Sequence, residues 1–129
     1  MKSNPENVPA EPQFKVCPSC KFLWNERDSF LSDPKVRLVG YQVNFDDLER
    51  GLFLFNHEKS RCRTTLAIEA RRFTDMYEGP VFRERLAGKE NECPGYCLYE
   101  SQLQPCPSKC NCAYVRAVLQ KVENWPKAV

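Results

Sequence analysis

The feature that most constrains this chain is its cysteine content, eight cysteines and a single histidine in 129 residues. The N-terminal stretch contains none of the uninterrupted apolar runs of about 7–15 residues that a secretory signal needs. We therefore expect a cytoplasmic location, where thiols stay reduced and disulfide frameworks are rare. Reduced cysteines at this density predict metal ligation. A disulfide framework remains the alternative if the chain is exported by a route that the sequence does not show.

The overall composition narrows the function classes. Hydrophobic residues make up 42% of the chain and charged residues 28%, which is typical of one globular domain at this length. The 19 Lys and Arg nearly balance the 17 Asp and Glu, leaving a net charge of +2. A general nucleic-acid binder needs a larger excess of basic residues, so nucleic acid is disfavoured as a partner. The longest apolar run, 52–55, is far shorter than the about 20 residues of a transmembrane helix.

The first cysteine pair has the spacing of a metal-binding turn. Cys17-Pro18-Ser19-Cys20 resembles a zinc knuckle, the CPxC half of a zinc ribbon, over these four residues. A two-residue gap allows both sulfurs to reach about 2.3 Å from one ion. Redox-active CxxC motifs share this spacing, but they open a helix directly after a strand, whereas a polar, proline-rich segment precedes this pair. The resemblance therefore implies two zinc ligands.

Two further ligands are needed to complete this site, and we expect them to be His57 and Cys62. His57 ends the second expected strand. If this strand folds back beside the first one, His57 and Cys62 would come close to Cys17 and Cys20. The resulting Cys3His set consists of the ligand types that zinc prefers. The alternatives are an ordinary loop histidine at 57 and a small buried core residue at 62.

Cys62 also has a possible role as a nucleophile or a redox sensor. Arg61 and Arg63 flank it, and we expect a helix to begin near Thr64. The helix dipole and both cations would then favour the Cys62 thiolate, with His57 as a base partner.

The second cysteine cluster lies between 93 and 112. The frame Cys93-x3-Cys97-x8-Cys106-x3-Cys110 consists of two similar pairs, which predicts a closed four-thiolate zinc shell. Cys112 competes with Cys110 for the fourth position. An iron–sulfur cluster is the rival occupant, although none of the common ferredoxin spacings is present. The expected metal ligands of the whole chain are thus Cys17, Cys20, His57, Cys62, Cys93, Cys97, Cys106, Cys110 and Cys112.

The strand signals lie in the first half of the chain. Apolar residues alternate from Val39 to Phe45, and Val36 and Leu38 are apolar on the opposite parity, which predicts a strand with a bulge near Val39 and Gly40. A single helical turn should follow over 46–51, closed by Gly51 in the left-handed conformation. The continuous apolar run at 52–55 predicts a second strand, buried on both faces and antiparallel to the first.

Two helices are expected to pack on this small sheet. Leu66, Ala70, Phe73 and Tyr77 fall on one face of a helix over 64–78. A second helix over 113–124 carries an apolar stripe of Val115, Val118, Leu119 and Val122. The predicted fold class is α+β, a small antiparallel sheet packed by two helices and stapled by one or two zinc sites. We expect residues 1–13 to be a disordered tail and 14–129 to be a single zinc-stabilised domain.

The function that these patterns favour is a non-enzymatic zinc-binding domain that acts as a protein-interaction or accessory module. The alternative is a thiol-redox or iron–sulfur protein that uses Cys62 or the 93–112 cluster. The sequence carries no phosphate-binding glycine motif and no nucleophile-elbow motif that would indicate an enzyme.

Overall fold

The structure is a computed structural model that describes residues 13–85, 95–107 and 110–128. Within these ranges the chain forms two antiparallel sheets and two α-helices, so an α+β architecture with a small antiparallel sheet is confirmed. A two-stranded hairpin pairs β1 (Lys15–Val16) with β2 (Leu23–Trp24), and α1 (Arg27–Ser32) follows it. The larger sheet has the order β3-β4-β5. The expected tail lies outside the described residues, except for residue 13.

The strand β3 (Val36–Gln42) contains the expected irregularity. Its pairing with β4 shifts register between Leu38 and Gly40, as the change of parity predicted. The shift lets Val36 and Leu38 share the buried side of the sheet with Tyr41. The predicted continuation of the strand to residue 45 is wrong, because β3 ends at Gln42 and the chain turns there.

The strand β4 (Leu52–His57) lies in the centre of the sheet. Phe53 and Phe55 are fully buried, whereas Leu52 and Leu54 are half-buried, so the expectation of burial on both faces is wrong. The connection from β3 contains a single 3-10 turn, η1 (Leu48–Arg50), as expected. Gly51 has a φ of −61° and is extended instead of left-handed.

The expected helix over 64–78 is wrong. Residues Thr64–Glu69 form the edge strand β5, and two 3-10 turns follow, η2 (Ala70–Arg72) and η3 (Thr74–Met76). Leu66 and Ile68 alternate with exposed residues, and β5 pairs in register with β4 along its whole length. Leu66 could be buried by either a helix or a strand. The β-branched residues of this segment favour the strand, and so does pairing with the edge of β4 that β3 leaves open.

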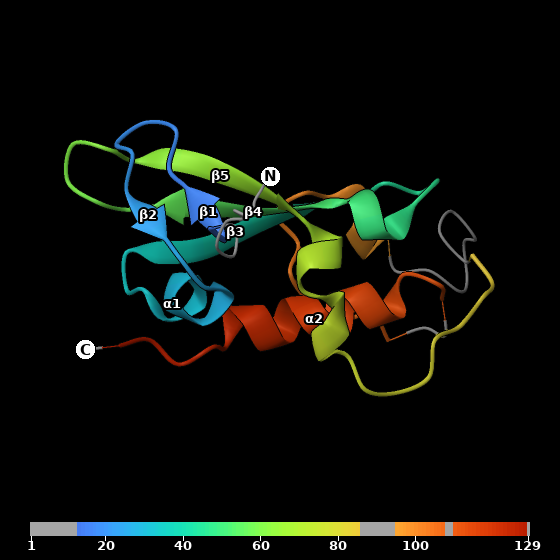
Figure 1. Ribbon diagram of the computed structural model, residues 1–129. Helices are drawn as coiled ribbons and strands as arrows, with labels where there is room; N and C mark the ends of the chain where they lie inside the picture. Colours follow the sequence, from blue (N-terminus) through green and yellow to red (C-terminus); the bar gives the residue numbers. More distant parts are fainter. Residues whose placement is uncertain (1–12, 86–94, 108–109, 129) are drawn as a thin grey trace, which may run out of the picture.

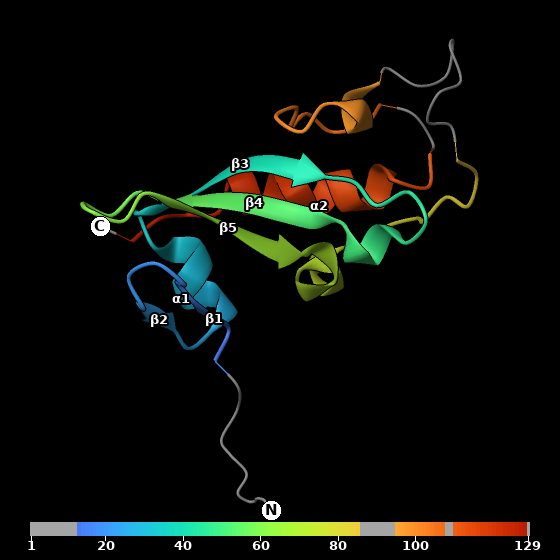
Figure 2. The same cartoon turned by 90° about the horizontal axis from the view of Figure 1, so that it is seen from above.

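The helix α2 (Ala113–Glu123) confirms the second helix prediction, and the four residues of its predicted stripe are buried. It lies along one face of the three-stranded sheet (Figure 1). The segment 95–107 runs beside β3, where the Tyr41 amide donates to the Glu100 carbonyl at 2.8 Å (Figure 2). In the described part of the chain, no helix combines the length and the apolar character needed to cross a membrane.

The β1–β2 hairpin and α1 gather at the end of the sheet where β4 finishes (Figure 2). Sequence patterns did not predict either element, since each strand of the hairpin has only two residues and α1 has six. Aromatic contacts hold them in place. Phe14 and Trp24 both pack against Phe30 of α1, which in turn packs edge-on against Phe55 of β4. The hairpin is thereby placed beside the last residue of β4.

Candidate metal centre

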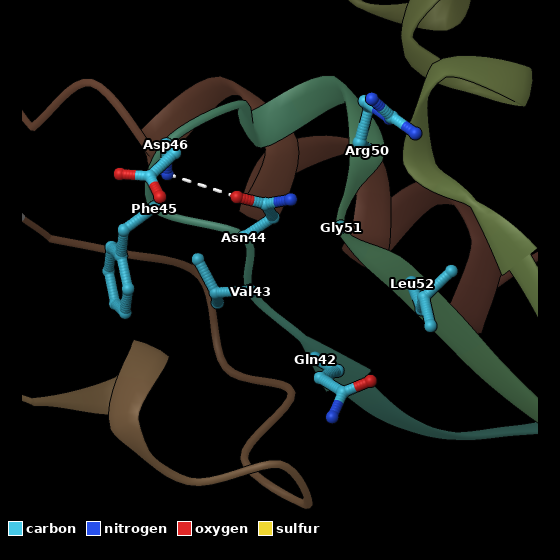
Figure 3. A pocket seen from close by; sticks show the side chains of 8 residues that line it. All are labelled: Gln42, Val43, Asn44, Phe45, Asp46, Arg50, Gly51 and Leu52. Atoms are coloured by element: carbon cyan, nitrogen blue, oxygen red, sulfur yellow. Dashed lines mark hydrogen bonds between the residues drawn. The ribbon is translucent and has the colours of Figure 1, made fainter.

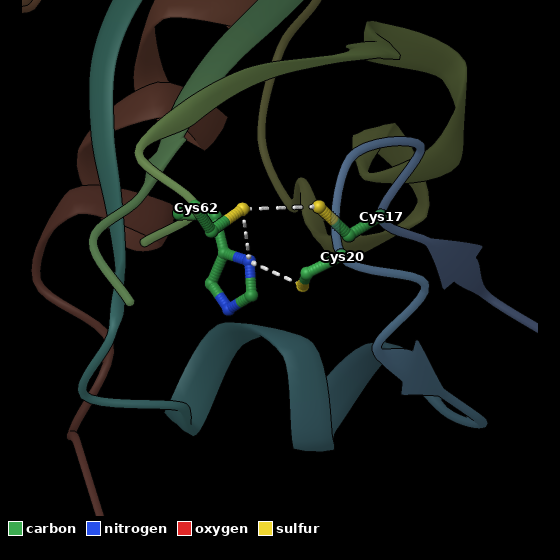
Figure 4. A group of neighbouring side chains, drawn as sticks. Cys17, Cys20 and Cys62 are labelled. Atoms are coloured by element: carbon green, nitrogen blue, oxygen red, sulfur yellow. Dashed lines mark hydrogen bonds between the residues drawn. The ribbon is translucent and has the colours of Figure 1, made fainter. Parts of the chain in front are cut away.

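Four predicted ligands come together at this end of the sheet. One ligand atom from each of Cys17, Cys20, His57 and Cys62 lies within 4.8 Å of all the others. The Cys17 and Cys62 sulfurs are 3.5 Å apart, and Nδ1 of His57 lies 3.5 Å from the Cys62 sulfur and 3.7 Å from the Cys20 sulfur. Figure 4 shows the three labelled cysteines with their sulfurs turned toward one region between the hairpin and the sheet. This group could hold a metal ion.

The hairpin positions the first two sulfurs through a closed backbone turn. The Cys17 amide donates to the Phe22 carbonyl, and the Lys21 amide donates back to the Cys17 carbonyl, each at 2.8 Å. Lys21 has a φ of +68°, the left-handed conformation that reverses the chain directly after Cys20. Both cysteines therefore lie at the tip of one tight turn, as the CPxC spacing predicts.

His57 is held by its burial and by aromatic neighbours. Its side chain is only 1% exposed, and the Trp24 ring packs edge-on against it at a centroid distance of 4.9 Å. Burial lowers the pKa of His57, because the buried site disfavours the imidazolium cation. The neutral ring that results is the form that ligates metals, and its Nδ1 atom faces the sulfurs.

Cys62 lies in the loop between β4 and β5, and its amide donates to the Lys59 carbonyl at 2.9 Å. Arg61 and Arg63 on either side of it both have a left-handed backbone, with φ values of +70° and +48°. Because a strand and not a helix begins at Thr64, no helix dipole acts on this thiol. The argument for an activated thiolate at a helix N-terminus is therefore wrong.

The cysteines of this group are partly shielded from solvent. Cys17 is fully buried and Cys20 and Cys62 are half-buried. Lys59, Arg61 and Arg63 are neighbours of these residues in sequence, and the Lys59 amine lies over the Phe22 ring, 5.3 Å from its centroid. With a divalent ion, three thiolates would carry a net charge of −1, which a neighbouring cation would stabilise. Within the described ranges, Cys17, Cys20, Cys62, Cys97 and Cys112 are free thiols.

The second cysteine cluster is found in part. The Cys97 and Cys112 sulfurs are 3.2 Å apart, and the Cys112 and Cys110 sulfurs are 3.6 Å apart. All three residues are buried, and the half-buried Cys106 packs against them. The fifth predicted ligand, Cys93, lies outside the described residues. The structure therefore brings four of the five cysteines into one cluster.

Arg116 of α2 is a site residue that the sequence analysis missed. It is fully buried, and its Nη1 lies 3.7 Å from the Cys97 sulfur. The hydrogen bond between Cys97 and Cys112, assisted by the Arg116 cation, lowers the pKa of Cys97 to about 6, whereas the same contact and burial raise the pKa of Cys112. Arg116 lies beside the predicted apolar stripe of α2 and is itself charged. The periodicity of apolar residues therefore gave no indication that its side chain would be buried.

A surface hollow elsewhere in the described ranges lies at the β3–β4 connection. It has a volume of about 410 Å³ and is lined by residues 42–46 and 50–52 (Figure 3). A turn within the chain shapes it, since the Asn44 side chain accepts hydrogen bonds from the amides of Asp46 and Asp47. Its described lining contains no cysteine or histidine, but Val43 and Phe45 of this lining also pack against the cluster of Cys97, Cys110 and Cys112.

Comparison with known proteins finds no match to any family, to any curated protein or to any solved structure. The geometry of the described residues thus carries the functional argument alone.

Proposed function

We propose that this chain is a zinc-binding accessory domain in which one Zn²⁺ is held by Cys17, Cys20, His57 and Cys62. The observation that carries the proposal is the convergence of one imidazole nitrogen and three sulfurs within 4.8 Å from two segments far apart in sequence. Two of the ligands come from the hairpin tip, one from the last residue of β4 and one from the loop that follows β4.

The separations of the ligand atoms support zinc as the occupant. Bond lengths of about 2.3 Å to sulfur and 2.0–2.1 Å to nitrogen give tetrahedral edges of about 3.8 Å between sulfurs and about 3.6 Å between sulfur and nitrogen. The separations here are 3.5 Å between the Cys17 and Cys62 sulfurs, and 3.5 and 3.7 Å from Nδ1 of His57 to two sulfurs. Sulfurs this close suit one shared ion, whereas the thiolates of an iron–sulfur cluster bind separate irons.

A structural role follows from the position of the site. Four protein ligands fill a tetrahedral shell and leave no position for a substrate or an activated water. The ion would link the two-residue strands β1 and β2 to the end of the central strand β4. Such short strands are not stable on their own, so we propose that residues 14–129 form one domain whose N-terminal hairpin is fixed by the metal.

Elemental analysis of protein purified without chelator tests this proposal. The variants Cys20→Ser and His57→Gln should each lose one zinc per chain relative to the wild type. Ser19→Ala is the matched control, because it changes the same turn without removing a ligand, and it should keep the full content. A wild-type zinc content that neither ligand variant lowers would overturn the assignment.

The accessory role rests on apolar side chains of the same hairpin. Val16, Phe22 and Leu23 are 42%, 41% and 40% exposed, although each is a large apolar residue. We propose that this hairpin surface contacts a protein partner in the cytoplasm, with zinc holding the surface in shape. Exposed apolar residues grouped on one element are typical of interaction sites.

A triple variant separates this contact from the metal. Val16→Ser, Phe22→Ser and Leu23→Ser together should keep the zinc content and the helical circular-dichroism signal, but should no longer cross-link to the protein that the wild type cross-links in cells. Cross-linking that persists in the triple variant would contradict the role assigned to this surface.

A further inference from the structure

The second cysteine cluster contains a buried cation without a carboxylate partner. Arg116 has no solvent exposure, and no salt bridge within the described residues includes it. Its Nε donates to the Gln104 carbonyl at 2.8 Å, its Nη2 donates to the Gln102 carbonyl, and its Nη1 faces the Cys97 sulfur. The two carbonyls accept hydrogen bonds from the guanidinium but do not neutralise its charge. Burying a guanidinium costs free energy unless an anion lies beside it.

The anion beside Arg116 is supplied by sulfur. The Cys97 sulfur lies 3.7 Å from the guanidinium, the Cys112 sulfur lies 3.2 Å from that of Cys97, and the Cys110 sulfur follows at 3.6 Å. Each of the two sulfur–sulfur separations, from Cys112 to Cys97 and from Cys112 to Cys110, is close to the edge of about 3.8 Å of a tetrahedron around one ion. The one-residue gap between Cys110 and Cys112 is therefore no obstacle to shared ligation.

A second buried polar side chain, that of Tyr41, lies close to Arg116. The Tyr41 hydroxyl is buried and makes no hydrogen bond to any described residue, and its residue is only 1% exposed. Its ring lies 5.7 Å from the Arg116 guanidinium carbon, and it feels the charges of Cys97 and Cys112. A buried donor without an acceptor costs free energy, and a thiolate-rich centre supplies the negative charge toward which such a donor can turn.

We propose that Cys97, Cys106, Cys110 and Cys112 form a second metal centre for a divalent, thiol-preferring ion such as Zn²⁺, with Arg116 as its charge-balancing positioning residue. Three of the sulfurs are buried, and the half-buried Cys106 packs against them as the fourth ligand. Four thiolates and a divalent ion carry a net charge of −2, and the guanidinium of Arg116 offsets half of it inside the protein. This centre fixes the segment 95–107 to the start of α2, whereas the first centre fixes the hairpin.

Metal counting in paired variants tests this proposal independently of the first site. The wild type should hold two zinc ions per chain. Cys17→Ser with Cys20→Ser should lower this to one, and Cys110→Ser with Cys112→Ser should also lower it to one. A single ion in the wild type that disappears entirely in the first double variant would overturn the second centre and leave the first intact. Iron in place of zinc, or a disulfide between Cys97 and Cys112 in purified protein, would overturn it as well.

Alkylation of the wild type keeps the test decisive if the second double variant does not fold. In the metal-loaded protein, Cys110 and Cys112 should resist a small thiol reagent, and they should react after zinc is withdrawn by a chelator, as mapped by mass spectrometry. Equal labelling of these two cysteines with and without zinc would contradict ligation.

Variants of Arg116 test its positioning role. Arg116→Met should weaken zinc binding at this centre by about 10–100-fold, the usual effect of removing a group that supports a ligand, and Arg116→Lys should restore part of it. The readout is the rate of zinc transfer to a chromophoric chelator, measured in the background that lacks the first site. Arg71→Met is the matched control, because Arg71 is an exposed residue that pairs with Glu69, and it should leave the rate unchanged. Equal transfer rates in Arg116→Met and Arg71→Met would remove Arg116 from the centre.

Discussion

Three non-glycine residues in the described ranges have left-handed backbones, and all three adjoin ligands of the first centre. Lys21 follows Cys20, and Arg61 and Arg63 flank Cys62, with φ values between 48° and 70°. An L side chain in this region suffers a steric clash that glycine avoids. The local backbone strain is thus concentrated next to Cys20 and Cys62, two of the proposed ligands.

Replacing Lys21 tests how large this strain is. Lys21→Gly should stabilise the metal-loaded protein by about 1 kcal/mol, because relief of the clash exceeds the added chain entropy of glycine. The measurement is chemical denaturation at fixed free zinc. Lys35→Gly is the control, since Lys35 is exposed and has no positive φ, and it should not gain stability. A loss of stability in Lys21→Gly would show that the lysine side chain outweighs the strain.

A second residue-scale prediction concerns Glu49, which links three elements. Its carboxylate accepts from the Tyr114 hydroxyl of α2 at 2.5 Å and from the Thr74 hydroxyl of η3 at 2.6 Å. Burial, followed by this contact with Glu49, raises the pKa of Tyr114, so the phenol stays protonated and donates. Glu49→Gln should therefore lower the free energy of unfolding by about 1–3 kcal/mol.

The matched control for Glu49 is Glu58→Gln, which breaks the exposed Arg37–Glu58 pair. An exposed ion pair contributes about 0–1 kcal/mol, so the control should change stability little. Equal losses in the two variants, measured by urea denaturation, would contradict a special role for Glu49.

At the scale of elements, the hairpin should depend on metal more than the sheet does. β1 and β2 have two residues each, whereas β4 pairs on both sides along its length. Withdrawal of zinc should therefore increase hydrogen exchange at the amides of Cys17 and Lys21 at least tenfold, with a smaller change at Phe53 and Phe55. Exchange mass spectrometry with and without chelator measures this. Uniform acceleration across hairpin and sheet would mean that the metal stabilises the fold as one unit.

The elements also show what the sequence could predict. The sequence predicted the register shift between Leu38 and Gly40 and the buried face of α2. Each of them shows in the local spacing of apolar residues along the chain. The helix prediction for the segment from Thr64 was wrong because Leu66 fits both a helical and a strand spacing of apolar residues. Pairing with β4 determines that the segment is a strand. The local spacing of apolar residues does not indicate which strands pair. It also does not indicate elements as short as η2, η3 and the six-residue α1.

The two cysteine clusters differ in the same way. The first four ligands were predictable because CPxC marks a turn and His57 ends a strand, so simple hairpin geometry brings them together. Arg116 was not predictable, because its contacts to Gln102, Gln104 and Cys97 depend on how the 95–107 segment folds over α2. Burial of a charge is a property of the tertiary fold and leaves no periodic trace in sequence.

At the scale of the whole molecule, stability should depend on free zinc. An ion that binds only the folded state adds about 1.4 kcal/mol to the free energy of unfolding for each tenfold rise in its free concentration above the dissociation constant. Two centres predict a slope of about 2.8 kcal/mol per tenfold rise. Denaturation in metal buffers measures the slope.

The variant Cys17→Ser with Cys20→Ser is the control for this slope. It should reduce the dependence to that of one ion, since its C-terminal cluster is unchanged. A wild-type slope of zero would contradict both centres, and an unchanged slope in the variant would contradict the first.

The distance along the chain between the two halves of the first centre has a consequence for biosynthesis. Cys20 and His57 are 37 positions apart, so the N-terminal thiols leave the ribosome well before their partners. Chains grow from the N-terminus, and this pair must wait until β4 and the following loop have been translated. During that interval the nascent chain presents the thiols of Cys17 and Cys20 without their proposed co-ligands, so an oxidant can join them before a metal is bound.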